Sequence, residues 1–148
     1  MPSKKKGQCA HCGAVGPITN DHVIQESVYG SEPPDNLYTV PACDACNQDS
    51  SSDEAYFRFF VSTGLPYEHP VARELTHGAM TRQLGQDARL RAEIEFAWRP
   101  ATLELGSGLL APTQSSEFDR TRIDRVFGKM ARGVYHVTHK KPMPQDAT

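Results

Sequence analysis

The sequence lacks the long apolar runs that a membrane protein needs. No stretch of its 148 residues approaches the roughly eighteen consecutive apolar positions typical of a transmembrane helix. The basic residues Lys4 to Lys6 near the start are not followed by an apolar segment, so no secretory signal is expected. These absences predict an intracellular, cytoplasmic protein in a reducing compartment, with no membrane partner.

An excess of positive charge is also missing, because the formal net charge is −2. A nucleic-acid-binding protein of this charge must gather its cations locally, since phosphate attraction is screened within about 8–10 Å. Two places qualify: the Lys4–Lys6 arm and residues 120–141, where seven Lys and Arg face one acid. A solvated tail and a solvated helix face are the alternatives. The candidate DNA contacts are Arg120, Arg122, Arg125, Lys129 and Arg132.

Cysteine is scarce, but its placement is regular. The four cysteines form two C-x-x-C pairs, Cys9 with Cys12 and Cys43 with Cys46, separated by thirty residues. In a reducing compartment this pattern is typical of a tetrahedral site in which four thiolates bind zinc at about 2.3 Å. Two disulfides or a C-x-x-C redox pair are the alternatives. The spacing therefore favours structural Zn²⁺.

The first half of the chain reads as two strands and a helix. Residues 17–24 and 37–40 are expected to be strands, the second bounded by Pro41. Ser51 and Glu54 have the spacing of a capping box, and Asp53 and Glu54 are expected to stabilise the helix N-terminus. The helix should end near Gly64. Its apolar stripe consists of Tyr56, Phe57, Phe60 and Val61.

The second half is mainly helical. Residues 71–98 predict one broken helix or two, and residues 102–105 and 109–111 could form a β-hairpin. A last helix is expected to start near Ser115 or Ser116. The predicted class is α+β, with a zinc-stapled domain at 1–64 and a helical region of unknown role at 65–148. A single joined core is equally consistent with the pattern.

Residues suited to metal and acid–base chemistry lie between and just after the cysteine pairs: Asp21, His22, Asn36 and Asn47. The order C-x-x-C, Asp-His, Asn, C-x-x-C-Asn resembles the zinc-containing branch of the HNH endonucleases over about residues 8–61. The resemblance implies a ββα-metal motif in which zinc ties the base of a hairpin to the start of a helix. Residues 129–135 are also similar to a stretch of bacterial and phage proteins predicted to be HNH endonucleases.

The residue types suit phosphodiester hydrolysis, which needs an activated water and a cation to neutralise the leaving oxygen. His22 is the candidate general base, because imidazole accepts protons at neutral pH. Asp21 and Asn47 offer oxygen ligands to a catalytic Mg²⁺ or Mn²⁺. The adjacent Asp21 and His22 would point to opposite faces of a regular strand, so a bulge or a metal under the hairpin is needed. The resemblance implies that Asn36 orients the His22 ring.

Each of these residues also has a simpler interpretation. Asn36 could be a turn residue, and Asn47 could be a helix N-cap. His11 lies inside the first cysteine pair and could replace a cysteine as a ligand, but four cysteines already complete a zinc shell, so a surface position is expected for it. The family has His at the position of Asn47, with Asn a variant in its cysteine-containing branch, and Gln25 replaces a usual Pro. The expected activity is DNA cleavage, with RNA a less favoured substrate and a homodimer among the oligomeric states. A non-catalytic zinc-stapled nucleic-acid-binding module and a structural zinc domain are the alternatives.

Overall fold

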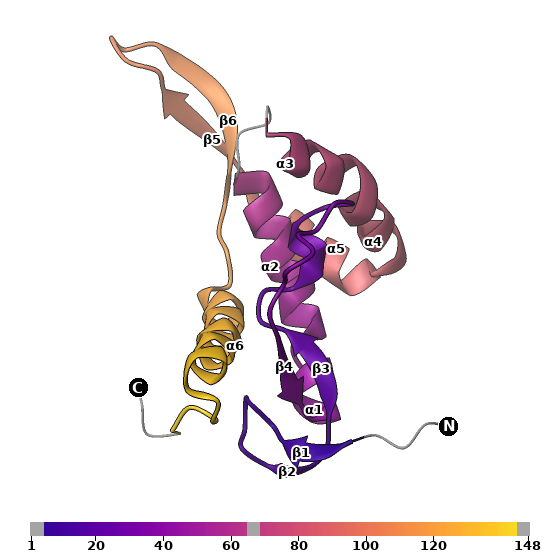
Figure 1. The fold of residues 1–148 in the computed structure, drawn as a ribbon. Coiled ribbons are helices and arrows are strands. Elements are labelled where there is room, and N and C mark those ends of the chain that lie inside the picture. The colour runs from indigo at the N-terminus through magenta and orange to yellow at the C-terminus, as the bar shows by residue number, and fades with distance from the viewer. Residues whose placement is uncertain (1–4, 65–68, 145–148) are drawn as a thin grey trace.

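The computed structural model describes residues 5–64 and 69–144, so Lys4 of the predicted basic arm lies outside the described residues. The protein belongs to the α+β class, as expected, with helices and three two-stranded antiparallel sheets in the part described (Figure 1). None of the helices in these residues combines the length and apolar character needed to cross a membrane.

The first hairpin frames the first cysteine pair. Strand β1 (Lys6–Gln8) pairs with β2 (Val15–Pro17), and the turn between them contains Cys9 and Cys12. Gly13 ends this turn with a φ of +75°, a left-handed conformation that glycine adopts without steric cost. Its N–H donates to the Cys9 carbonyl oxygen at 2.9 Å, so the turn is closed by its own backbone.

The second hairpin leads into the first helices. Strand β3 (Thr19–His22) pairs with β4 (Thr39–Ala42), and the short 3-10 helix η1 (Glu26–Val28) lies in the loop between them. Pro41 was expected to end the second strand but lies inside β4, which tolerates it because β4 is an edge strand. Helices α1 (Asp44–Gln48) and α2 (Ser51–Gly64) follow, giving the expected order of strand, strand and helix.

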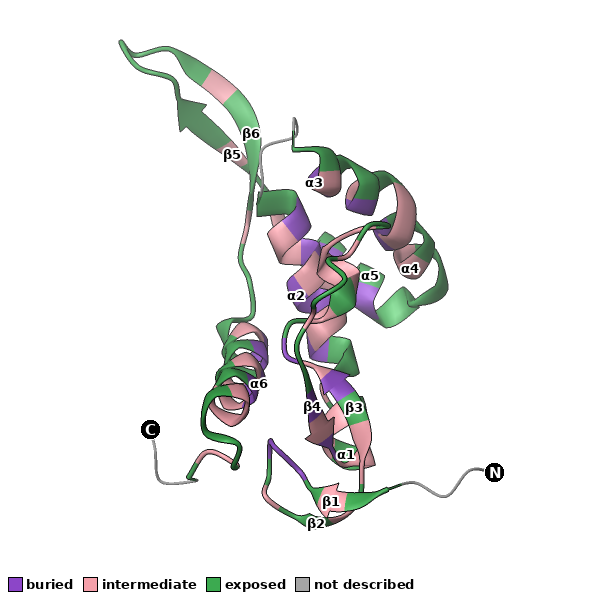
Figure 2. Cartoon of the chain, viewed as in Figure 1, coloured by how far each residue is buried: buried purple, intermediate pink, exposed green. Residues whose placement is uncertain are grey.

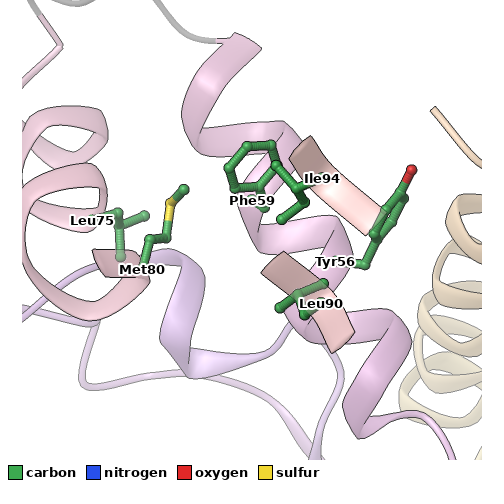
Figure 3. Close-up of a cluster of buried hydrophobic side chains, with 6 residues drawn as sticks. All are labelled: Tyr56, Phe59, Leu75, Met80, Leu90 and Ile94. Carbon is green, nitrogen blue, oxygen red and sulfur yellow. The ribbon is translucent and has the colours of Figure 1, made fainter. Parts of the chain in front are cut away.

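The main hydrophobic core forms where α2 meets the next helices. Helix α3 (Pro70–Leu75) continues through the π-helical turn η2 (Thr76–Met80) into α4 (Thr81–Gln86). The helical conformation is interrupted at Asp87. Its side chain caps α5 (Ala88–Ala97) by accepting a hydrogen bond from the Leu90 N–H at 2.9 Å. The prediction of a broken helix is confirmed. The buried cluster in Figure 3 comprises Tyr56, Phe59, Leu75, Met80, Leu90 and Ile94.

A long hairpin separates this core from the last helix. Strand β5 (Trp98–Glu104) pairs with β6 (Leu110–Ser116), and the hairpin extends away from the helices with both strands largely exposed (Figures 1 and 2). The predicted hairpin is confirmed but is longer than expected. Because Ser116 still pairs with Trp98, the last helix begins later than predicted. Helix α6 (Arg120–His139) starts after its N-cap Asp119.

Helix α6 returns to the first half of the chain. It packs along α2 and reaches the second hairpin, where Val137 joins a small core of Ala10, Val23 and Val40. At Gly133 the helix backbone lies so close to Val23 that an added Cβ would be 3.0 Å from a Val23 methyl carbon. The predicted division at residue 64 therefore separates helices that share an interface.

Candidate metal centre and hairpin site

The four cysteine sulfurs form one compact cluster. Cys9 and Cys12 come from the turn after β1, Cys43 is the N-cap of α1, and Cys46 lies inside α1. All four Sγ atoms lie within 4.8 Å of one another, and the Sγ atoms of Cys12 and Cys43 are 3.8 Å apart. No disulfide joins any of the four, all of which lie in the described residues. The predicted pairing of the two C-x-x-C motifs in space is confirmed.

The protonation of the cluster suits a bound cation. Burial raises the pKa of the Cys9 thiol, but hydrogen bonds from nearby backbone N–H groups, that of Cys43 first, lower it to about 6. Burial and the neighbouring sulfur of Cys43 raise the pKa of Cys46. Backbone N–H groups thus stabilise the Cys9 thiolate, whereas burial and the neighbouring sulfur disfavour a second thiolate at Cys46. A dication removes this opposition, so a tetrahedral set of four sulfurs is compatible with zinc.

A second candidate site lies at the end of the second hairpin. Asp21 and His22 are the last two residues of β3, and both line a cavity of about 480 Å³. The β3–β4 pairing is regular through His22, so no bulge is needed for both residues to reach the same cavity. Asn47 from α1 and Glu54 from α2 line it as well. The structure therefore brings three of the four predicted hairpin-site residues together.

Asn47 presents an amide to this cavity from inside a helix. Its Nδ2 donates to Thr19 Oγ1 at 3.1 Å, which leaves the side-chain carbonyl oxygen for another partner. Cys43 is the N-cap of α1, so the interpretation of Asn47 as an N-cap is wrong. The cavity offers carboxylate and amide oxygens, which suit Mg²⁺ or Mn²⁺ held by few protein ligands. Among the described residues, only the cysteines form a tight group of three or more thiol, imidazole or carboxylate ligands.

Asp21 is held by two cationic or polar partners. His11 Nε2 and Lys129 Nζ each lie 2.9 Å from Asp21 Oδ2. Burial raises the pKa of Asp21, but the hydrogen bonds from His11 and Lys129 outweigh burial and leave the pKa below its usual value. His11 was predicted to lie on the surface, and this prediction is wrong. The ring is buried because the first cysteine turn folds over Asp21.

Asn36 does not join the cavity. It is exposed in the turn that Asp35 and Asn36 form before β4, and it is not among the residues that line the cavity containing His22. Its position matches the turn interpretation, in which a short polar side chain favours the local backbone conformation. Orientation of the His22 ring by Asn36 stays a prediction.

Two cations of the predicted DNA-binding helix are buried against acids of α2. Arg122 Nε lies 2.7 Å from Asp53 Oδ1, its Nη1 pairs with Glu93, and its guanidinium stacks 4.3 Å above the Tyr56 ring. Lys129 Nζ lies 2.6 Å from Glu54 Oε1. The structure corrects the expected role of these two residues, because their charges are already neutralised inside the protein.

The other three predicted DNA contacts are more accessible. Arg120 is exposed and lies 3.4 Å from Asp124 within the same helix. Arg125 is more than half exposed although its Nε contacts Asp53 Oδ2 at 2.6 Å, and Arg132 is half-buried. DNA contact stays a prediction for these three residues.

The ion pairs between α2 and α6 were not predicted from the sequence. Asp53 and Arg122 are 69 positions apart, and Glu54 and Lys129 are 75 apart. Asp53 and Glu54 were expected to act locally at the start of α2, yet both bind α6. The charge pattern of α2 and α6 was the available hint, since acids begin one helix and cations line the other.

Comparisons with protein-family models, with curated proteins and with solved structures give no match to this chain. The likeness to the HNH endonucleases therefore rests on the motif residues themselves. The features that bear on function are the geometry of the cysteine cluster and that of the hairpin cavity.

Proposed function

We propose that this chain is a metal-dependent HNH endonuclease that hydrolyses DNA phosphodiester bonds, with a ββα-metal motif stabilised by zinc. The observation that supports the proposal is that Asp21, His22 and Asn47 line one cavity. That cavity lies beside the α1 turn that carries Cys43 and Cys46, as the motif requires. A cysteine cluster next to a polar cavity with an imidazole is an arrangement suited to hydrolysis.

Each residue has a role that follows from its chemistry. The imidazole of half-buried His22 accepts a proton from the attacking water. Asp21 and Asn47 would hold Mg²⁺ or Mn²⁺, which neutralises charge on the phosphate and on the leaving oxygen. The four cysteines would hold Zn²⁺, which fixes the turn after β1 to the start of α1. The accessible cations Arg120, Arg125 and Arg132 would contact the DNA backbone.

Cleavage of supercoiled plasmid by the zinc-loaded full chain tests this proposal. We expect nicking or linearisation with Mg²⁺ or Mn²⁺, and loss of cleavage in His22→Ala. His69→Ala is the matched control, because His69 is exposed and lies outside the cavity. Both variants should keep their zinc content and thermal midpoint. Equal cleavage by wild type and His22→Ala would remove His22 from the mechanism.

One observation favours a second candidate, a zinc-stapled nucleic-acid-binding module without catalysis. The Lys129 ammonium lies between the carboxylates of Asp21 and Glu54, so an internal cation already balances two acids of the cavity. A site neutralised in this way needs no metal for its stability. This candidate predicts DNA or RNA binding without turnover under any divalent metal. Metal-dependent turnover that is lost in His22→Ala would exclude it.

A further inference from the structure

Asp21 is attached to two distant parts of the chain through one carboxylate oxygen. His11 comes from the turn that carries Cys9 and Cys12, and Lys129 comes from α6. His11 Nε2 is hydrogen-bonded to Oδ2 and Lys129 Nζ forms an ion pair with it, each at 2.9 Å, and both side chains are more than nine-tenths buried. The side-chain contacts found for Asp21 within the described residues involve Oδ2, and Asp21 also lines the cavity of His22 and Asn47.

The contacts of His11 and Lys129 define which of their nitrogen atoms faces Asp21 Oδ2. A carboxylate accepts, so His11 Nε2 carries the proton in this hydrogen bond. The opposite nitrogen, Nδ1, is buried and has no partner among the described residues. Lys129 Nζ donates to Glu54 Oε1 at 2.6 Å and to Ser50 Oγ at 2.8 Å, and it forms an ion pair with Asp21 Oδ2.

We infer that His11 is a positioning residue that, with Lys129, fixes Asp21 so that Oδ1 stays available to the catalytic cation. The inference rests on the proposed function, because it assigns Asp21 as a metal ligand. His11 lies between two cysteines of the cluster, so its ring position depends on the cysteine turn. The cysteine cluster and the hairpin cavity are thereby joined through a single side chain. Such outer partners orient metal ligands and raise metal affinity.

Two variants of His11 separate positioning from simple packing. The amide nitrogen of Gln reaches about as far as Nε2 of a histidine, so His11→Gln keeps a donor toward Asp21. His11→Asn carries the same amide on a chain one methylene shorter, so it does not reach. The dissociation constant of Mn²⁺ is measured by electron paramagnetic resonance on the zinc-loaded full chain, with zinc content and thermal midpoint recorded for each variant.

We expect His11→Asn to weaken Mn²⁺ binding by about tenfold or more, the usual effect of removing an outer-shell partner, while His11→Gln stays close to wild type. Equal Mn²⁺ affinity in wild type and both variants would overturn the inference and leave the proposed function standing. Loss of zinc and of thermal stability in both variants, in step with weaker Mn²⁺ binding, would overturn it in favour of a merely structural role. A wild-type chain that binds no Mn²⁺ would overturn the proposed function itself, and this inference with it.

Discussion

Arg122 Nε lies 2.7 Å from Asp53 Oδ1, in a buried ion pair that joins α6 to the start of α2. Asp53 Oδ2 also forms an ion pair with Arg125 Nε, so one carboxylate binds two cations of the last helix. The same helix carries Lys129 to Asp21. The last helix is therefore attached to the hairpin site by ion pairs and forms part of its surroundings.

Replacing Asp53 with Asn tests this attachment. The change leaves the buried Arg122 with Glu93 but without its carboxylate partner on α2, so the free energy of unfolding should fall by about 3 kcal/mol. Asp124→Asn is the matched control, because Asp124 forms an exposed pair with Arg120 and should cost less than about 0.5 kcal/mol. Chemical denaturation measures both. Equal effects of the two substitutions would contradict the assigned role of Asp53.

The same pair predicts a dependence of stability on pH. Hydrogen bonds from Arg125, and then from Arg122, hold the pKa of Asp53 below its usual value despite burial. A lowered pKa in the folded state means that the stabilisation is complete above the unfolded pKa of about 3.9 and is lost as the pH falls through the folded value. The stability difference between wild type and Asp53→Asn should therefore shrink below about pH 4. A difference that is constant from pH 7 to pH 3 would refute this.

The contact between Gly133 and Val23 predicts a position-dependent effect on one helix. Gly133→Leu forces a side chain against the buried Val23 and should destabilise the protein by about 1–3 kcal/mol. Gly128→Leu is the control, since a Cβ there meets only the end of the Arg132 side chain. Higher helix propensity should make that variant neutral or more stable by up to about 1 kcal/mol. Thermal unfolding measures both variants, and equal stability would contradict the close approach of α6 to the hairpin.

Metal removal should act on the two N-terminal hairpins more than on the helical core. With the four thiolates no longer held together, the turn after β1 separates from α1, because these short hairpins bury little apolar surface. Hydrogen exchange should show early loss of protection in β1 to β4, with α5 protected longer. Zinc content measured before and after chelation provides the control. Unchanged protection in zinc-free protein would show that the cluster is not a stabilising metal site.

The accessible cations of α6 predict the salt dependence of DNA binding. If Arg120 and Arg132 bind phosphates, replacing both with Ala should weaken binding and reduce the salt slope by about 0.9 for each phosphate that is no longer neutralised. Arg91→Ala, an exposed residue of α5, is the control. Fluorescence anisotropy over a range of salt concentrations gives the slopes. An unchanged slope in the double variant would exclude this face of α6 from the DNA interface.

The parts of the site that are close in sequence were predictable. Two identical C-x-x-C pairs fix the ligand chemistry, because each short turn places two sulfurs together. Asp21 and His22 are adjacent in the sequence, so they must lie close together. Asn47 directly follows Cys46, so its position is set by the second cysteine pair. Helix α2 ends at Gly64, as the pattern indicates.

The long-range pairing was not predictable from one sequence. A surface position was expected for His11 because four cysteines complete a zinc shell, and nothing local in the sequence shows that the cysteine turn folds over Asp21. A DNA contact was expected for Lys129 because it lies in a cation-rich segment. Its partners Glu54 and Asp21 lie 75 and 108 positions away, so the sequence gives no sign that they neutralise it. Local patterns report helix faces and turns, whereas the docking of α6 depends on tertiary packing at Gly133.

Chemical rescue of the His22→Ala variant tests the central claim most directly. The zinc-loaded wild type, incubated with supercoiled plasmid and Mn²⁺, should convert it to nicked or linear DNA, and the variant should not. Added imidazole should restore measurable cleavage to the variant, because a diffusible base can occupy the space that the His22 ring leaves. Cleavage by the variant at the wild-type rate without imidazole, or no cleavage by a wild type that binds DNA under any divalent metal, would contradict the proposed nuclease mechanism.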